Sequence, residues 1–428
     1  MLDQPAKRKE FLFLQGPPGP FFRQLGQELE SRGAGVHRIN LSGGDRYDWH
    51  EGAVDFRGRT NRWPRYFDRF LREHGITDLV LFGDCRPMHQ AALRLAQLRG
   101  VHIHVFEEGY IRPDWMTLER DGVNGHSRLD RDPEVIMAAA KWLPPIPKLP
   151  PITAQFRRRA RDSYWHYHHV FLGKLRFPFY RSHRQGSLVA DAIGWLLRFA
   201  RAQHRARQAE ATLCEIEGAK FFLFTLQLSG DYQIRAHSPF GSMREAVEYV
   251  LESFARHAPA DCQLLVKEHP LDSGYLNWRS FLATCAKAHG VADRVLHIDG
   301  GDLPELAQAA IGMVCVNSTS GTLALEVGSP VIVLGDAVYD VPGVTHQGGL
   351  DLFWSGPELP DRALYQAFKK ILHAKCLVRG GLASESAIQI LIRNSADRLI
   401  ADEGIDRRRR SPVPAPVQEL GTRPAASR

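Results

Sequence analysis

Short apolar runs that end in glycine, proline or acidic residues, each followed by a stretch with helical spacing, recur in two successive series. The first series begins near Glu10 and includes the runs 78–82 and 101–106, and the second begins near Lys220 and includes 263–267. Strands and helices that alternate in this way predict parallel sheets covered by helices. With 428 residues, the chain is long enough for two such domains.

This element order resembles the GT-B arrangement: an α/β fold in which two Rossmann-like domains with parallel sheets face each other across a cleft. The same order also fits a nucleotide-sugar epimerase. We place the first domain at residues 1–210, including a basic, aromatic insertion at 157–207, and the second at 211–400. Residues 401–428 are predicted to be a disordered basic tail.

Basic residues are concentrated in the insertion and in the tail. Residues 157–207 hold twelve Lys and Arg against two acidic residues, and 407–428 hold six Arg against one Glu. The run YWHYHH at 164–169 places aromatic rings among these charges. Such a mixture suits the headgroup region of an anionic lipid surface, where each basic residue contributes about 1 kcal/mol. Nucleic acid is the competing partner, but no nucleic-acid module is recognisable, so we expect lipid and no nucleic acid.

The six cysteines show no CxxC spacing, and the histidines of YWHYHH have no acidic or cysteine partner at the spacing of a metal site. We therefore expect no disulfide framework and no metal. Cysteines used as small hydrophobic residues are typical of a reduced, cytoplasmic protein. No run reaches the ~18 apolar residues of a membrane-spanning helix.

Glu107 and Glu108 directly follow the predicted strand 101–106, at the end of a strand where α/β sheets place ligand groups. Two adjacent carboxylates repel each other, so we expect one of their pKa values to be raised. A carboxylate with a raised pKa is a good general base for a sugar hydroxyl. The alternative is a solvated acidic turn.

His269 and Pro270 follow the predicted strand 263–267 of the second series. An imidazole can donate to a phosphate and stabilise a leaving nucleotide, and the proline restricts the backbone beside it. Lys267 adds positive potential if it lies on the same face. A structural histidine is the alternative.

The turn NSTSGT, residues 317–322, supplies hydroxyls and N–H groups at the start of a predicted helix. This arrangement suits a phosphate or carboxylate, although plain N-capping explains it equally. Its candidate donor-binding residues are Asn317, Ser318, Thr319 and Ser320. Five more residues in turns after strands are predicted to line the cleft: Gly16, Gly19, Asp84, Gln227 and Asp231.

Five segments together resemble the KpsS-type capsular polysaccharide biosynthesis proteins: GPPGPFF, EEGYIRPDWMTLE, QLSGDYQIR, KEHP and NSTSGTLALEVGSPVIVLGDAVYD. The resemblance extends from about Phe11 to Ile400. It implies a bacterial β-Kdo glycosyltransferase with sialyltransferase-like motifs, an acceptor-side first domain and a CMP-sugar-binding second domain. The implied reaction is metal-independent, inverting transfer of Kdo from CMP-Kdo to a phosphatidylglycerol-type lipid, which starts the poly-Kdo linker of capsular polysaccharide.

By this resemblance, the acidic motif falls on Glu107 and Glu108, the HP motif on His269 and Pro270, and the Ser/Thr pair on Ser318 and Thr319, with Ser320 as an alternative register. We expect Glu108 to be the base and Glu107 its orienting neighbour. Several relatives have Asp where this chain has Glu.

The resemblance implies no cofactor besides the donor substrate. It also implies peripheral attachment to the anionic cytoplasmic face of the inner membrane, with other capsule biosynthesis and export proteins as candidate partners. Two alternatives stay open at this point. One is a sialyltransferase-like enzyme that uses another CMP-ulosonate, and the other is a non-catalytic capsule-export adaptor.

Overall fold

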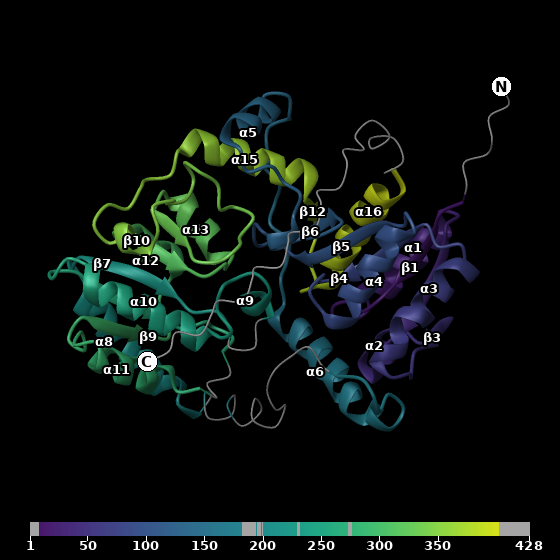
Figure 1. Ribbon diagram of the computed structural model, residues 1–428, viewed down its shortest axis with the longest axis horizontal. Coiled ribbons are helices and arrows are strands. Elements are labelled where there is room, and N and C mark those ends of the chain that lie inside the picture. Colours follow the sequence, from purple (N-terminus) through teal and green to yellow (C-terminus); the bar gives the residue numbers. More distant parts are fainter. Residues whose placement is uncertain are drawn as a thin grey trace, which may run out of the picture.

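The structure, a computed structural model, describes residues 8–181, 194, 198, 200–228, 232–272 and 276–401. Two α/β units lie side by side in it, each built around one sheet (Figure 1). The predicted α/β class with two largely parallel sheets is confirmed.

In the described residues, the first unit has a seven-stranded sheet in the order β12-β6-β5-β4-β1-β2-β3. Its strands are β1 (Glu10–Phe13), β2 (Gly35–Asn40), β3 (Ala53–Asp55), β4 (Asp78–Phe82), β5 (His102–Glu108), β6 (Trp115–Arg120) and β12 (Leu377–Arg379). β1 to β5 are parallel, β6 is antiparallel to β5, and β12 is antiparallel to β6.

Successive side chains along a strand point to opposite faces of the sheet. In this sheet both sets of side chains are apolar, so both faces are buried. Phe11 and Phe13 face one side and pack with α1 (Phe21–Ser31) and α16 (Glu385–Ala401). Leu12 faces the other side and packs with α3 (Trp63–Glu73) and α4 (Pro87–Leu98). Helices therefore cover both faces, as a doubly wound sheet requires.

The second unit has a five-stranded parallel sheet in its described part, in the order β11-β10-β7-β8-β9. The strands are β7 (Phe221–Thr225), β8 (Gln263–Lys267), β9 (Val295–Ile298), β10 (Gly312–Cys315) and β11 (Val331–Val333). Its helices are α8 (Ala202–Ile216), α9 (Tyr232–Ala236), α10 (Met243–His257), α11 (Trp278–Ala288), α12 (Leu303–Ala309), α13 (Ser320–Val327), α14 (Leu350–Phe353) and α15 (Arg362–Lys375).

The two sheets share one topology. In each, the first five strands along the chain lie in the spatial order third, second, first, fourth, fifth, which is the order of a Rossmann-type sheet. In such sheets, ligands bind beyond the carboxyl ends of the strands. The predicted glutamate pair forms the end of β5, and the predicted HP motif follows β8, so both stand at these ends.

The predicted domain range 211–400 requires a correction. Strand β12 pairs with β6 of the first sheet, and α16 packs against α1. The chain therefore returns to the first unit after α15, a crossing that no local pattern reveals. At the other boundary, α8 begins at Ala202, before the predicted limit at 210, and packs against β9 of the second unit.

The remaining elements of the first unit are η1 (Thr60–Arg62), α2 (Gly43–Asp48), η2 (Asn124–His126), α6 (Phe156–Leu172) and η3 (Gly173–Leu175). Helix α5 (Pro133–Ala140) instead packs against α15 and the core of the second unit. Helix α6 packs closely on α2, because Gly43 and Gly44 leave room for the backbone of His169 and the ring of His166. Parts of the predicted insertion 157–207 (182–193, 195–197 and 199) and of the predicted tail (402–428) lie outside the described residues. No helix in the described part is long and apolar enough to cross a membrane.

Candidate active site

Glu107 and Glu108 are the last two residues of β5, a strand paired with β4 on one side and β6 on the other. The Oε1 atom of Glu107 accepts the N–H of Glu108 at 3.0 Å. The Oε1 atom of Glu108 accepts a hydrogen bond from Arg159 of α6 at 2.7 Å. Glu107 thus lies near the turn after β4, and Glu108 lies against α6.

Glu107 has a raised pKa. Burial of its carboxyl group raises the pKa of Glu107 to about 7, while the N–H of Glu108 opposes this change and the negative charge of Glu108 adds to it. The expectation that one acid of the pair has a raised pKa agrees with this result, and that acid is Glu107. A carboxyl group that titrates near neutral pH is suited to general-base catalysis.

His269 directly follows Glu268 at the end of β8, and its Nδ1 atom accepts the N–H of Leu271 at 3.0 Å. Burial, followed by the positive charges of Arg112, Arg198 and Lys267, lowers the pKa of His269 to about 4. The ring is therefore neutral near pH 7 and carries its proton on Nε2. It can donate this proton in a hydrogen bond to an anion without being charged itself.

Arg112 connects the two motifs. It belongs to the loop between β5 and β6, its Nε atom donates to the carbonyl of Gly109 at 3.3 Å, and its charge acts on His269 of the second unit. In the same region, Thr322 of α13 donates to the carbonyl of Tyr110 at 3.3 Å. The loop that follows the glutamate pair therefore approaches both the HP motif and the Ser/Thr turn.

The turn at 317–320 combines structural bonds with one open hydroxyl. Asn317 and Gln227 hold each other through two hydrogen bonds of 2.8 and 3.0 Å, which fixes both amides. Ser318 accepts the N–H of Ser320 at 3.1 Å. Thr319 is the N-cap residue of α13, and its hydroxyl makes no capping bond. This hydroxyl is the part of the turn that suits an anion, because the first three N–H groups of α13 already bond to Ser318 and Thr319.

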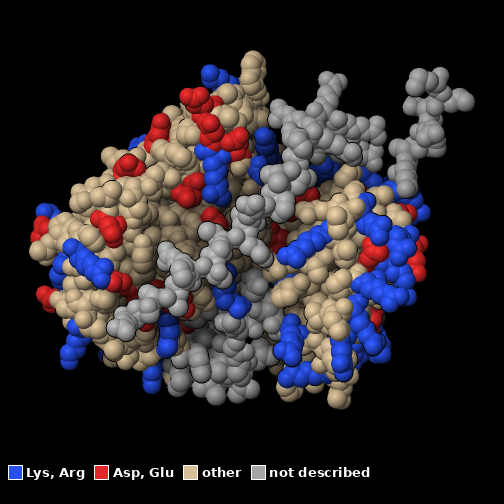
Figure 2. Space-filling view, viewed as in Figure 1, with Lys and Arg blue, Asp and Glu red and all other residues tan. Residues whose placement is uncertain are grey.

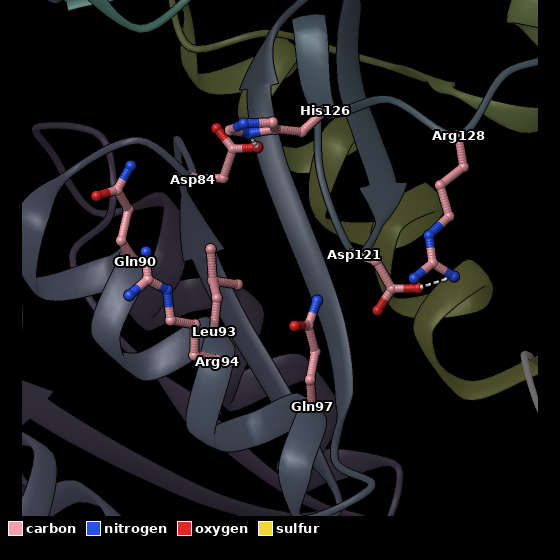
Figure 3. Close-up of a pocket in the computed structure, with 8 residues that line it drawn as sticks. All are labelled: Asp84, Gln90, Leu93, Arg94, Gln97, Asp121, His126 and Arg128. Atoms are coloured by element: carbon pink, nitrogen blue, oxygen red, sulfur yellow. Dashed lines mark hydrogen bonds and ion pairs between the residues drawn. The ribbon is translucent and has the colours of Figure 1, made fainter. Parts of the chain in front are cut away.

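The residues predicted to line a cleft have different positions. Gly16 packs against the ring of Phe22, and Gly19 donates to Asp48 at 3.2 Å, so both serve the packing of the first unit. Gln227 is fixed by Asn317, and Asp231 lies outside the described residues. Asp84 borders a cavity of about 390 Å³ (Figure 3).

Several residues near this site were not predicted from the sequence. Arg159 bonds to Glu108, and the charge of Arg112 acts on His269. Cys85, His126 and His237 gather around Asp84. Cys85 had one usable signal, since it stands in the turn after β4, at the same edge of the sheet as the glutamate pair. His126 and His237 are distant in sequence and had none.

A model of the family described as "Capsule polysaccharide biosynthesis protein" matches residues 77–382. The chain is 34% identical over 378 residues to the "Capsule polysaccharide export protein KpsS" of Escherichia coli, which covers 86% of this chain and 96% of that protein. It is 34% identical over 376 residues to the "Capsule polysaccharide modification protein LipB" of Neisseria meningitidis serogroup B, which covers 84% and 88%.

Among solved structures, a similar one is that of Thermosulfurimonas dismutans KpsC, a beta Kdo 2,7 transferase. The TM-score is 0.42 at 13% identity, and the match covers 84% of this chain and 89% of the other.

Proposed function

The chain belongs to the capsule polysaccharide biosynthesis protein family, and we propose that it transfers Kdo from CMP-Kdo to a phosphatidylglycerol-type lipid at the start of the capsular polysaccharide linker. The observation that carries this proposal is the contact between the loop after the glutamate pair and the second unit, where Thr322 of α13 donates to the carbonyl of Tyr110 at 3.3 Å. The charge of Arg112, in the same loop, also acts on His269. These observations support a candidate base and a site for an anionic leaving group on either side of the contact between the units.

The donor end is assigned to the cations around His269. The positive charges of Arg112, Arg198 and Lys267 act on His269, and Arg198 is also ion-paired with acidic neighbours. CMP-Kdo brings a phosphate and a carboxylate. In the proposed reaction, the Nε2–H of His269 donates to the phosphate as the CMP leaves. The hydroxyl of Thr319, at the N-terminus of α13, holds the second anionic group. The step as proposed uses no metal.

The acceptor end is assigned to the glutamate pair. We propose Glu107 as the base, because its pKa of about 7 allows it to accept a proton from the acceptor hydroxyl. Glu108 was the base expected from the resemblance, and it is the alternative. Its bond to Arg159 supports a role in holding the loop and α6 together.

Stereochemistry distinguishes two uses of a carboxylate. If a carboxylate acts only as base, the acceptor attacks directly and the anomeric configuration inverts, as the resemblance implies. If it acts as a nucleophile, two displacements retain the configuration. Comparing the anomeric configurations of donor and product by NMR decides between these roles.

The proposed membrane contact is the exposed face of α6 and η3. The large exposed side chains there recur at helical spacing: Tyr164, Trp165, Phe171, Leu172 and Leu175. Lys174 lies 4.9 Å from the centre of the Phe171 ring. Lys and Arg side chains gather on the part of the first unit that carries α2, α3 and α6 (Figure 2, lower right). An apolar stripe bordered by cations suits insertion into an anionic leaflet.

The experiment is a donor and acceptor screen with the purified chain. CMP-Kdo or CMP-sialic acid is supplied with vesicles of phosphatidylglycerol or phosphatidylcholine, and products are identified by mass spectrometry. A Kdo-lipid formed only with CMP-Kdo and phosphatidylglycerol supports the proposal. A product formed only with CMP-sialic acid favours the sialyltransferase-like alternative. Absence of CMP release with every donor, from a chain that binds the vesicles, favours the adaptor.

A further inference from the structure

Four side chains with metal-ligating atoms converge where the two units meet. Asp84 and Cys85 follow β4, His126 ends η2, and His237 follows α9 of the second unit. One ligand atom of each lies within 4.8 Å of the others. The Sγ atom of Cys85 is 3.0 Å from Nε2 of His237 and 3.1 Å from Oδ1 of Asp84. Nδ1 of His126 is 3.0 Å from Oδ2 of Asp84.

Two glycines make this convergence possible. Gly83 has φ of 70°, a left-handed conformation, and it turns the chain from β4 into Asp84 and Cys85. Gly125 lies so close to His237 that a Cβ atom at this position would stand 2.4 Å from its Nδ1 atom. A larger residue at 125 would therefore separate η2 from the second unit.

We propose that Asp84, Cys85, His126 and His237 bind a zinc ion, or a divalent transition metal of similar preference, that joins the two units. Thiolate, imidazole and carboxylate ligands are the set that zinc prefers, and four of them complete a tetrahedral structural site. Bond lengths of about 2.0–2.3 Å place such ligand atoms roughly 3.3–3.8 Å apart. The contacts of 3.0–3.1 Å need to lengthen by roughly 0.2–0.8 Å, and the remaining pairs, all within 4.8 Å, need to settle at the same spacing.

The charges balance in this buried place. When the metal binds, the Cys85 thiol loses its proton to solvent, and one thiolate and one carboxylate then neutralise the divalent cation. Asp84, Cys85 and His237 are buried, so a neutral set avoids the cost of an unpaired buried charge. Asp84 also accepts the N–H of Val123 at 3.0 Å, which orients its carboxylate.

The cluster is accessible from one side. His126 is exposed and, together with Asp84, borders the cavity of about 390 Å³, where Figure 3 shows their side chains next to each other. An ion can enter through this cavity without unfolding of the interface. Three ligands come from the first unit and one from the second, so the metal would fix how the two units sit. This inference goes beyond the proposed transfer and does not rest on it.

The test is titration of the untagged full-length chain, after treatment with a chelator, with Co²⁺ and then Zn²⁺. We expect one equivalent of Co²⁺ to produce a thiolate-to-cobalt charge-transfer band and the visible bands of a tetrahedral ion, and zinc to displace both. Cys85→Ser removes the charge-transfer band. His126→Ala, which replaces an exposed ring, weakens zinc binding at least about tenfold. Even the loss of a residue that only hydrogen-bonds to a metal ligand lowers metal affinity by that much.

Matched controls are Cys214→Ser and His289→Ala, both at exposed positions outside the cluster, which keep the band and the affinity. Circular dichroism checks that each variant is folded. If Cys85→Ser fails to fold, His126→Ala decides alone. The proposal is overturned if the wild-type chain shows no charge-transfer band at one equivalent, or if the folded variants bind zinc as tightly as the wild type.

Discussion

Arg159 of α6 holds the carboxylate of Glu108 at 2.7 Å, and so joins the basic helix to the glutamate pair. Glu107, the preceding residue, has no such cation bonded to its carboxylate in the described residues; its Oε1 atom accepts the N–H of Glu108. The pair is therefore asymmetric: one acid is ion-paired and the other has a raised pKa. This asymmetry assigns different roles to two adjacent residues of the same type.

The first prediction concerns these roles. Glu107→Gln should lower kcat by about 10²–10⁴-fold, the usual contribution of a general base, with little change in KM for the donor. Glu108→Gln should lower kcat less, because it removes a bond to Arg159 and not the proton acceptor. Steady-state rates of CMP release measure both. A larger loss in Glu108→Gln would identify Glu108 as the base.

The second prediction concerns pH. A base must be deprotonated, so kcat/KM should rise with pH through a pKa of about 7, and this limb should disappear in Glu107→Gln. Stability should change in the opposite direction. The folded pKa of Glu107 lies above its ordinary value of 4.5, so the folded state holds an extra proton between these values and loses stability as pH rises through them. At pH 8, Glu107→Gln should thus have the higher Tm, and equal Tm values would contradict this expectation.

The third prediction concerns the neutral imidazole. His269→Ala should lower kcat by roughly 10²-fold, the order expected when a hydrogen bond to developing charge is removed. His269→Gln should recover part of this loss, because its amide N–H can replace the Nε2–H donor. The pKa of His269 is about 4, so the rate should show no second limb from this residue between pH 5 and 8. Equal losses in both variants would point to a packing role.

The sequence alone predicts the parts of the fold that depend on local pattern. The strand ranges 78–82 and 263–267 agree with β4 and β8, because each is an apolar run bounded by polar turns. Strands β6 and β12 were not predicted. Their positions depend on pairing at the edge of the first sheet, and β12 reaches that edge only after the chain has completed the second unit.

In the candidate site too, residues marked by a local pattern could be predicted, and residues brought together only by the fold could not. The glutamate pair and His269 could be found because strand ends in α/β sheets are where ligand groups stand. The cluster around Asp84 could not, since Cys85 and His237 are 152 residues apart and meet only through the contact between units. The raised pKa of Glu107 also depends on its burial in the folded chain, which no local pattern reveals.

The fourth prediction concerns the turn before α13. In Gly321→Ala, the new Cβ atom would stand 2.3 Å from the hydroxyl of Tyr339, a buried residue that donates to the carbonyl of Ser318. We expect a loss of about 1–3 kcal/mol in stability, as for other overpacked positions, and a higher KM for the donor. Gly356→Ala is the control, since nothing lies within 4 Å of the Cβ position there. Equal Tm values for the two variants would show that the turn accommodates the added Cβ atom without loss of stability.

The fifth prediction concerns the exposed stripe of α6 and η3. Leu172 and Leu175 are 59% and 96% exposed, so their replacement should not disturb the core. The double change Leu172→Asp, Leu175→Asp places two negative charges where the proposed contact needs apolar side chains, so it should reduce sedimentation with phosphatidylglycerol vesicles severalfold. Activity on a short-chain acceptor in solution should stay near the wild-type level. Leu359→Asp, at a position 75% exposed in the second unit, is the control for added charge. If this control reduces vesicle binding as much as the double change, general charge governs attachment and the stripe has no specific role.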